Sequence, residues 1–212
     1  MDSISNNTSS IYRALLKEKI ISTATTCFHS QGIKAVKMDD IAHRLSISKR
    51  TLYELFHNKE ELLLACIKSG RERFTKHLEE LMRQGANTMD VFMDIITTQM
   101  DDTHRINPLF FAEMDKYPSV VNYLEKTRAE QHANSQEFFI KGVKEGYFRD
   151  DVNFDIVLEI SNSCVEHVMK SAMYDRFPLY EIHHTVTIVF VRGLCTEKGV
   201  KCIDDTLRRV EK

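Results

Sequence analysis

The chain has 212 residues, of which 42% are hydrophobic and 28% are charged, and it contains only 7 Gly and 3 Pro. This composition excludes collagen-like, low-complexity and wholly disordered proteins, and the scarcity of Gly and Pro favours an all-α fold over an all-β fold. The net charge is only −2, but residues 1–60 hold nine Lys and Arg against six Asp and Glu, so a mildly basic front precedes an acidic remainder.

No apolar run approaches the ~18 residues that a membrane-spanning helix needs, so we expect no membrane partner. The first ten residues lack the basic and apolar segments of a secretion signal, and we therefore expect a cytoplasmic protein. The five cysteines are odd in number and form no Cys-x-x-Cys pattern. Most of them lie among apolar helical positions, which is typical of reduced core residues.

The first predicted elements are helices. Residues 1–8 are polar and are expected to form a disordered arm. Apolar residues then recur at helical spacing up to residue 31, and Gly32 follows as a helix stop. Two short periodic segments, 38–45 and 49–56, are separated by three residues, which is the spacing of a helix-turn-helix.

Longer helices follow along the rest of the chain. One is expected over 58–84, with Asn58 as its N-cap and Glu61 in the capping-box position. The breaks at Pro and Gly then predict helices over 87–104, 106–116, 118–145, 154–175, 178–197 and 201–210.

The segment 49–56 has two different faces if Ser48 caps it. The residues that then pack inward are Leu52, Leu55 and Phe56. The residues that project from the opposite side are Lys49, Arg50, Tyr53 and His57. Cations near the start of such a helix can donate to guanine O6 and N7 in the major groove of DNA, and a tyrosine can contact a phosphate or a thymine methyl.

The start of the predicted helix 58–84 is a second place for DNA. Its free backbone N–H groups and the ammonium of Lys59 favour a phosphate. The residues expected to contact phosphates are Lys37, Arg44, Ser48, Thr51, His57 and Lys59. Such contacts position a protein on the duplex but carry no sequence information.

The stretches 32–42, 45–53 and 56–62 together resemble the DNA-binding segment of TetR-family transcriptional regulators, and the similarity extends over about residues 12–67. The resemblance implies an all-α protein in which an N-terminal three-helix DNA-binding head, with a helix-turn-helix, joins a C-terminal helical body that binds a ligand and dimerises. The implied boundaries are 9–57 for the head and 58–212 for the body, with helix 58–84 connecting the two.

The resemblance also implies roles for single residues. The positions that match base-contacting or adjacent positions are Lys49, Arg50 and Tyr53. Lys59 matches the phosphate-binding lysine of the family. Lys37 stands where the family often has a capping Thr, so the cap is expected to be lost while the phosphate contact persists. Ser46 replaces a frequent Gly in the turn.

Two predicted body helices, 154–175 and 178–197, are apolar on more than one side, so each needs two partners. One partner can be the core and the other the same surface of a second copy, which gives a symmetric homodimer. The residues expected at this interface are Val157, Ile160, Cys164, Val168, Ile182, Val186, Val189 and Phe190. Two heads about 34 Å apart would bind a near-palindromic operator.

The body is rich in Met and aromatic side chains, which adapt to varied ligands. The residues expected to line an effector pocket are Phe92, Met93, Ile96, Met100, Phe110, Phe111, Met114, Tyr123, Phe138, Cys164 and His167. An ordinary apolar core is the alternative interpretation of these residues.

We therefore expect a sequence-specific transcriptional regulator, a repressor that a small, largely apolar effector releases from DNA. We expect no catalytic residues, metal or cofactor. One alternative is a di-iron carboxylate oxidase or metal-storage bundle, because Glu54/His57 and Glu181/His184 have the Glu-x-x-His spacing of such sites. Another is an interaction protein whose head no longer binds DNA.

Overall fold

The computed structural model describes the backbone of residues 2–210 and the side chains of residues 10–128 and 135–208. Within residues 2–210 the chain forms ten α-helices and two short 3-10 helices, which confirms the all-α prediction. Contacts divide the chain into two compact units. The head unit comprises Met1–Phe74 and Leu109–Tyr123, and the body unit comprises Thr75–Pro108 and Leu124–Lys212.

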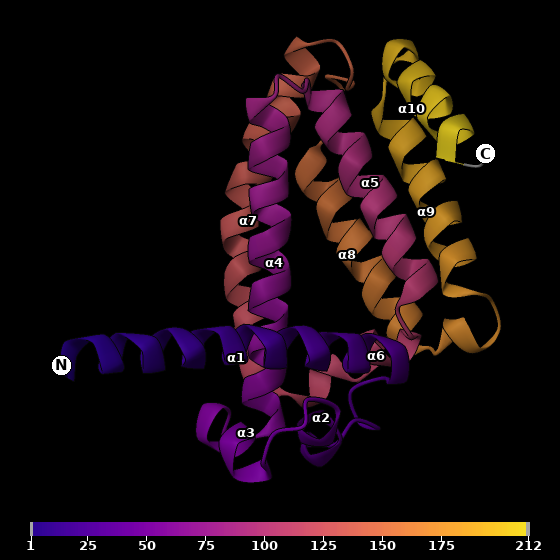
Figure 1. The fold of residues 1–212 in the computed structure, drawn as a ribbon. Helices are drawn as coiled ribbons and strands as arrows, with labels where there is room; N and C mark the ends of the chain where they lie inside the picture. The colour runs from indigo at the N-terminus through magenta and orange to yellow at the C-terminus, as the bar shows by residue number, and fades with distance from the viewer. Residues whose placement is uncertain (1, 211–212) are drawn as a thin grey trace. The chain divides into compact units, whose positions relative to one another are not determined.

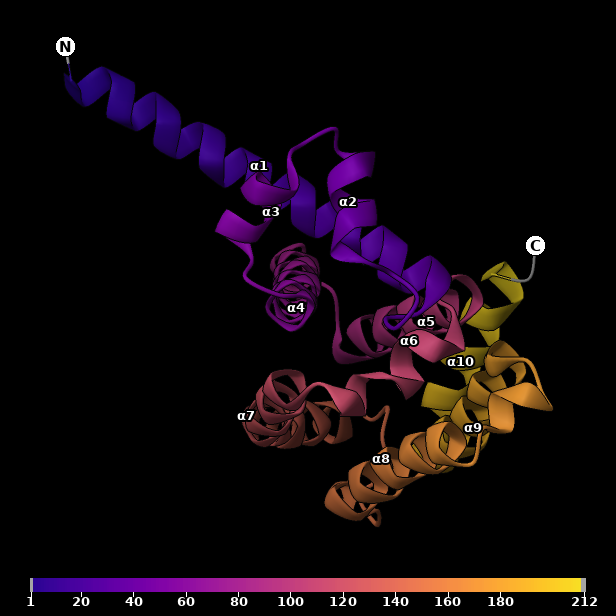
Figure 2. The ribbon, with the colours of Figure 1, turned by 90° about the horizontal axis from the view of Figure 1, so that it is seen from below.

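The head unit contains three helices from the start of the chain and parts of four later elements. In chain order these are α1 (Asp2–Gln31), α2 (Met38–Arg44), α3 (Lys49–Leu55), the first part of α4 (Lys59–Arg83), α6 (Pro108–Ala112), η1 (Met114–Lys116) and the start of α7 (Pro118–Lys144). Figures 1 and 2 both show α2 and α3 beside α1. The predicted arm of residues 1–8 lies outside the residues whose side chains are described, and α1 begins at Asp2.

The head core comes from one face of each helix. The α1 side chains Ile20, Ala24, Cys27 and Phe28 recur at helical spacing and are at most 1% exposed. Gly32 ends this helix with a φ of +82°, and its N–H donates to the carbonyl of Phe28 at 3.0 Å. A Cβ at Gly32 would lie 2.8 Å from the Cβ of Leu109, so only glycine fits both the backbone and the packing.

The turn between α2 and α3 requires a left-handed residue. Ser46 has a φ of 52°, and its N–H donates to the carbonyl of His43 at 3.0 Å. The next N–H, from Ile47, donates to Ala42 at 3.0 Å. This geometry explains why glycine is frequent at the position and why a serine there is strained.

The body unit contains the remaining parts of α4 and α7 and five further elements. These are α5 (Thr88–Arg105), α8 (Phe154–Lys170), η2 (Met173–Asp175), α9 (Leu179–Leu194) and α10 (Glu197–Val210). Helix α5 packs along α9, and α10 contacts both of them (Figure 1). The buried cluster of this unit is Met89, Met93, Ile96, Met100, Phe139, Phe148, Val191, Cys195 and Ile203.

Most predicted helices are confirmed within one to three residues at each end, but four are corrected. Helix α1 begins at Asp2 and not after the predicted arm of residues 1–8. The expected helix 106–116 is broken into α6 and η1. The expected helix 154–175 ends at Lys170, because Ala172 adopts a left-handed φ of 48° without any glycine to indicate it. Helix α10 starts at Glu197 and not at residue 201, because the hydroxyl of Thr196 accepts from the N–H of Gly199 at 3.3 Å and caps it.

All five cysteines are free, and Cys27, Cys66 and Cys195 are buried. Burial raises the pKa of Cys66 and of Cys195 to about 11. These two thiols stay protonated near neutral pH and are poor nucleophiles. They therefore behave as small apolar core residues, as the sequence predicts.

Candidate nucleic-acid interface

Helix α3 has the two faces that its sequence predicts. The hydroxyl oxygen of Ser48 accepts from the backbone N–H of Thr51 at 3.0 Å, which confirms the predicted cap. Leu52 and Phe56 are at most 1% exposed, because they complete the head core. With these two side chains inward, the other face of the helix is turned to solvent.

The solvent face of α3 carries the predicted base-contacting residues. Lys49, Arg50 and Tyr53 are exposed, and Tyr53 is 43% exposed although it is aromatic. An exposed phenol between cations can contact both a phosphate and a base edge. The predicted division of α3 into a buried and an exposed side is confirmed for Leu52 and Phe56, whereas Leu55 is half-buried. Contact of the exposed residues with DNA stays a prediction.

Both cations on this face have a carboxylate partner. The Lys49 ammonium donates to Asp39 of α2 at 2.6 Å, and the Arg50 Nε donates to Glu54 at 2.8 Å. The hydrogen bond to its carboxylate raises the pKa of each cation. Sequence reasoning missed Asp39 because an ion pair between two helices depends on how they pack. We name the four charged side chains Asp39, Lys49, Arg50 and Glu54 the α2–α3 charge cluster.

Most of the predicted phosphate contacts lie around this cluster. Lys37, Arg44 and His57 are exposed, as such a contact requires. The Ser48 and Thr51 hydroxyls bond to each other at 2.8 Å, so their lone pairs and protons are partly used by the cap. The Lys37 side chain makes no capping hydrogen bond to α2, as predicted. Its backbone N–H donates to the Asp40 carboxylate at 3.3 Å.

Lys59 has a structural role that the sequence did not predict, and its contact with a phosphate stays a prediction. Its ammonium donates to three carbonyls of the α1–α2 loop: Ile33 at 2.9 Å, Lys34 at 3.3 Å and Val36 at 3.0 Å. Partial burial lowers its pKa. An ammonium has only three N–H donors, so this geometry makes Lys59 a brace for the loop and uses the donors that a phosphate would need.

The start of α4 is capped as predicted, but its second partner differs. The Asn58 side chain accepts from the N–H of Glu61 at 2.8 Å. The Glu61 carboxylate does not return to Asn58 and instead accepts from the backbone N–H of His57 at 2.8 Å and contacts its ring Nδ1 at 2.9 Å. These bonds lower the pKa of Glu61 and hold the exposed His57 against α4.

Glu113 is a buried carboxylate that sequence reasoning missed. It is 8% exposed and accepts from the backbone N–H of Lys34 at 2.6 Å, in the same loop that Lys59 braces. A single acid inside the apolar run of residues 109–114 was the available signal. Nearby, the carboxylate of Glu60 accepts from the backbone N–H of Ser119 at 2.7 Å. The two bonds join the segment 109–123 to the α1–α2 loop and to α4 within the head unit.

The predicted effector residues fall into two groups. Phe110, Phe111, Met114 and Tyr123 belong to the head unit, whereas Phe92, Met93, Ile96, Met100 and Phe138 belong to the body unit. In the body, Met93, Ile96 and Met100 border a void of about 10 Å³, which is too small for a ligand. Cys164 is half-buried and His167 is exposed on α8, so their place in an effector pocket stays a prediction.

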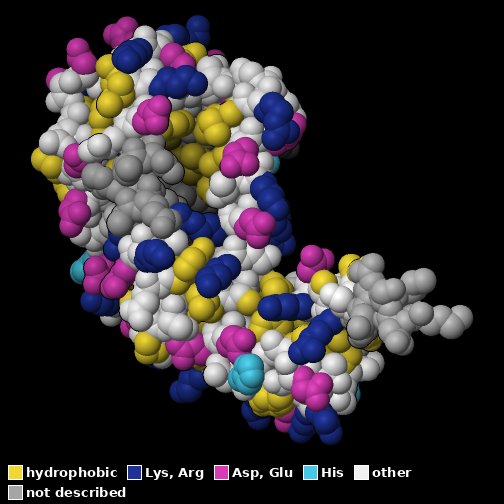
Figure 3. Space-filling model, turned by 90° about the vertical axis from the view of Figure 1, so that its left-hand side faces the viewer, with side chains coloured by type: hydrophobic (Ala, Val, Ile, Leu, Met, Phe, Trp, Pro, Cys, Tyr) yellow, Lys and Arg dark blue, Asp and Glu magenta, His cyan; other side chains and the backbone are white. Residues whose placement is uncertain are grey.

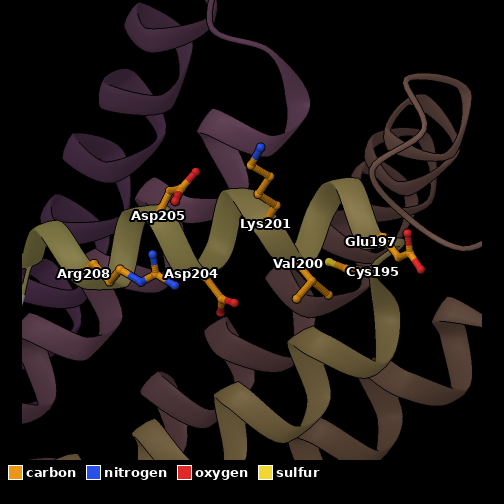
Figure 4. Close-up of a pocket in the computed structure, with 7 residues that line it drawn as sticks. All are labelled: Cys195, Glu197, Val200, Lys201, Asp204, Asp205 and Arg208. Atoms are coloured by element: carbon orange, nitrogen blue, oxygen red, sulfur yellow. The ribbon is translucent and has the colours of Figure 1, made fainter.

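A larger hollow lies on the surface of α10. Its volume is about 470 Å³, and Figure 4 shows the residues that line it: Cys195, Glu197, Val200, Lys201, Asp204, Asp205 and Arg208. It contains none of the predicted effector residues. Acidic and basic side chains alternate along it, and Asp204 pairs with Arg192 at 2.5 Å.

The predicted dimer residues are partly on the outside of the body unit. Ile160 and Val189 are 44% and 67% exposed, and Val157, Cys164, Val186 and Phe190 are half-buried. Val168 and Ile182 are only 8% exposed, so their prediction as interface residues is corrected: both face the core of their own unit. Ile156 and Val165, at 56% and 60%, are additional exposed apolar residues on α8.

Two observations bear on the alternative of a di-iron protein. The Glu54 carboxylate already holds Arg50. Among the described residues no cluster of three or more His, Cys, Asp and Glu side chains has the arrangement of a metal site.

Two features concern the molecule as a whole. Within the part of the chain that the structure describes, no helix is long and apolar enough to cross a bilayer. Figure 3 shows Lys and Arg intermixed with Asp and Glu over one face of the molecule, so an argument for DNA binding depends on individual residues and not on overall charge.

Known proteins resemble the chain in the same region. Residues 20–66 match the family model described as bacterial regulatory proteins, tetR family. IcaR, the negative transcriptional regulator of the biofilm operon icaADBC from Staphylococcus epidermidis, is 30% identical over 95 residues, which cover 45% of this chain and 42% of IcaR. The chain thus aligns with less than half the length of that relative.

Two further relatives extend over more of the chain. The transcriptional repressor KstR2 of Mycobacterium tuberculosis is 20% identical over 144 residues, 66% of this chain and 72% of KstR2. The crystal structure of a transcriptional regulator from Saccharomonospora viridis in complex with choline has a TM-score of 0.67 at 14% identity and covers 87% of this chain and 100% of that one. These similarities support the same two-part helical fold.

Proposed function

This chain belongs to the TetR family of bacterial regulatory proteins, and from that premise we propose that it represses transcription by binding operator DNA as a homodimer and that a small molecule releases it. Its relatives are regulators, and the chain is a regulator and not an enzyme. A repressor of this kind acts in the cytoplasm. The di-iron alternative is not favoured.

The observation that carries the proposal is the solvent face of α3. Burial of Leu52 and Phe56 leaves Lys49, Arg50 and Tyr53 outward on a short capped helix that follows α2 by a tight turn. A helix presented in this way fits the major groove, where Arg and Lys donate to guanine. Lys37, Arg44 and His57 are available beside it for phosphates.

We assign residues 9–57 to DNA binding and 58–212 to effector binding and dimerisation, with α4 as the connection. The exposed apolar side chains of α8 and α9 suit a second copy of the chain. Two symmetric heads would bind a near-palindromic operator. The Met-rich and Phe-rich core of the body unit suits a largely apolar effector.

Selection of bound duplexes from a random DNA pool tests the proposal. An enriched inverted repeat is the expected result, because it requires both base contacts and two-fold symmetry. No preference for any duplex at moderate ionic strength would overturn the proposal. A screen for compounds that release the selected duplex then tests the effector.

Single substitutions test the base contacts. Arg50→Ala and Tyr53→Ala are each expected to weaken binding by about 1 to 3 kcal/mol and to relax sequence preference. Unchanged footprints of both variants on the operator would remove the two residues from base contact.

A further inference from the structure

The α2–α3 charge cluster, which lies on the proposed base-contacting face of the head unit, has no net charge. The two cations of the α2–α3 charge cluster are matched by its two carboxylates, at 2.6 Å for Lys49 and Asp39 and at 2.8 Å for Arg50 and Glu54. All four side chains are well exposed, from 48% for Asp39 to 89% for Arg50. A surface that binds DNA by charge alone would not contain these carboxylates, because phosphates repel them.

Folding does not account for the two ion pairs. Pairs between exposed side chains contribute little to stability, since water and salt screen them. Helix α3 is already held by the Ser48 cap and by burial of Leu52 and Phe56. The carboxylates must therefore have their main effect on what the cations can bind.

The geometry of the Arg50 pair restricts how its guanidinium can donate. The Nε donates to Glu54, so the two terminal Nη groups remain as donors. Two Nη groups side by side match the O6 and N7 acceptors of one guanine. With Nε occupied, Arg50 is held near the axis of α3 and is less able to turn toward a phosphate.

The Lys49 pair acts in the same way across two helices. An ammonium on a flexible four-carbon chain can reach many phosphates when it has no partner. Asp39 belongs to α2 and fixes the Lys49 ammonium over the junction of α2 and α3, while two of its three N–H donors remain for a base. The hydrogen bond to Asp39 raises the pKa of Lys49, so the pair stays charged.

We propose that Asp39 and Glu54 are specificity-determining residues, which hold Lys49 and Arg50 so that these donate to base edges and not to phosphates. This inference rests on the proposed function, because it concerns how the same face selects one DNA sequence. It assigns the two carboxylates an effect on the ratio of specific to non-specific affinity.

Asp39→Asn and Glu54→Gln test this inference, because each removes a charge while keeping the shape of the side chain. Anisotropy titrations of the full chain would use the selected duplex and a scrambled duplex of the same composition, over a series of salt concentrations. We expect the ratio of the two affinities to fall about tenfold in each variant. For the scrambled duplex, the slope of the logarithm of the binding constant against the logarithm of the salt concentration should steepen by about 0.9 for each cation that leaves its carboxylate and contacts a phosphate.

Asp101→Asn is the matched control, because it removes an exposed carboxylate that pairs with Arg105 at 3.2 Å, four residues away on α5. It should leave the ratio unchanged. If both test variants keep the wild-type ratio of the two affinities, this inference is overturned and the proposed function is not. Equal weakening of binding to the two duplexes counts as a retained ratio. Equal binding of both duplexes by the wild-type chain would instead overturn the proposed function and this inference with it.

Discussion

The α2–α3 surface of the head and the α8–α9 surface of the body present different chemistry to solvent. The first consists of paired charges around one exposed tyrosine, with Leu52 and Phe56 at most 1% exposed on the inner side. The second exposes Ile156, Ile160, Val165 and Val189 by 44% to 67%. An interface with DNA is polar and charged, whereas the centre of a homodimer interface is apolar. The difference indicates a separate kind of partner for each surface.

The largest effect is expected when the apolar surface is made acidic. Ile160→Asp would bury a charge in the proposed dimer interface, so we expect monomers in light scattering coupled to size-exclusion chromatography. Loss of the second head should weaken binding to the selected inverted repeat by about 100-fold or more.

Met82→Asp is the control for this substitution. Met82 is also apolar and is 50% exposed, but it lies on α4 outside the α8–α9 surface. It should leave the dimer intact. If the double variant Ile160→Asp and Val189→Asp is still a dimer, the α8–α9 surface is not the dimer interface.

A smaller effect is expected from the brace in the head. Lys59→Met keeps the aliphatic stem but leaves the carbonyls of Ile33, Lys34 and Val36 without their charged donor. We expect the free energy of unfolding to fall by about 2 kcal/mol in urea titrations. Lys19→Met, an exposed position on α1, should have little effect.

The same variant separates the two roles of Lys59. If Lys59 only braces the loop, the salt dependence of DNA binding by the folded variant is unchanged. If Lys59 contacts a phosphate, the slope of the logarithm of the binding constant against the logarithm of the salt concentration becomes shallower by about one. The variant then loses little stability. The second outcome would show that the head rearranges on binding DNA.

The two left-handed residues without a glycine allow a matched comparison of the units. Ser46 in the head has a φ of 52°, and Ala172 in the body has a φ of 48°. Replacing either by Gly relieves steric strain but increases the entropy of the unfolded chain, so we expect a net gain of about 0.5 to 1 kcal/mol in each case. Thermal unfolding measures both, and a loss of stability in either variant contradicts the assigned strain.

The smallest effect is expected from acid. Burial lowers the pKa of His183 in the body below its usual 6.5, and its Nδ1 has no hydrogen-bond partner among the described atoms. The unfolded chain binds this proton more readily, so stability falls as the pH drops through 6.5. The carboxylates Glu60 and Glu61 of the head have lowered pKa values, so their contribution is lost only below 4.5.

Between about pH 7 and about pH 5.5, hydrogen exchange should therefore increase in the body unit and not in the head unit. His183→Gln should reduce this increase. Equal acid sensitivity of the wild type and the variant would mean that other groups cause it.

Much of the site could be predicted because its features are local. The cap at Ser48, the inward Leu52 and the outward Lys49 all depend on residues within one helical turn of each other. The partners of charged groups could not be predicted in this way. Asp39 meets Lys49 from another helix, and Lys59 meets carbonyls more than twenty residues earlier in the chain.

The sequence by itself determined the order of the long helices, the caps of α3 and α4, and the position of the proposed DNA-binding surface, because the helical period and the capping bonds involve near neighbours in the chain. Only the tertiary structure decided that Glu113 is buried against the loop, that Val168 and Ile182 face the core, and that Ala172 adopts a left-handed backbone just after α8. These features depend on which surfaces pack together. Residues distant in the sequence determine which apolar face of a helix is buried and which acceptor a donor meets.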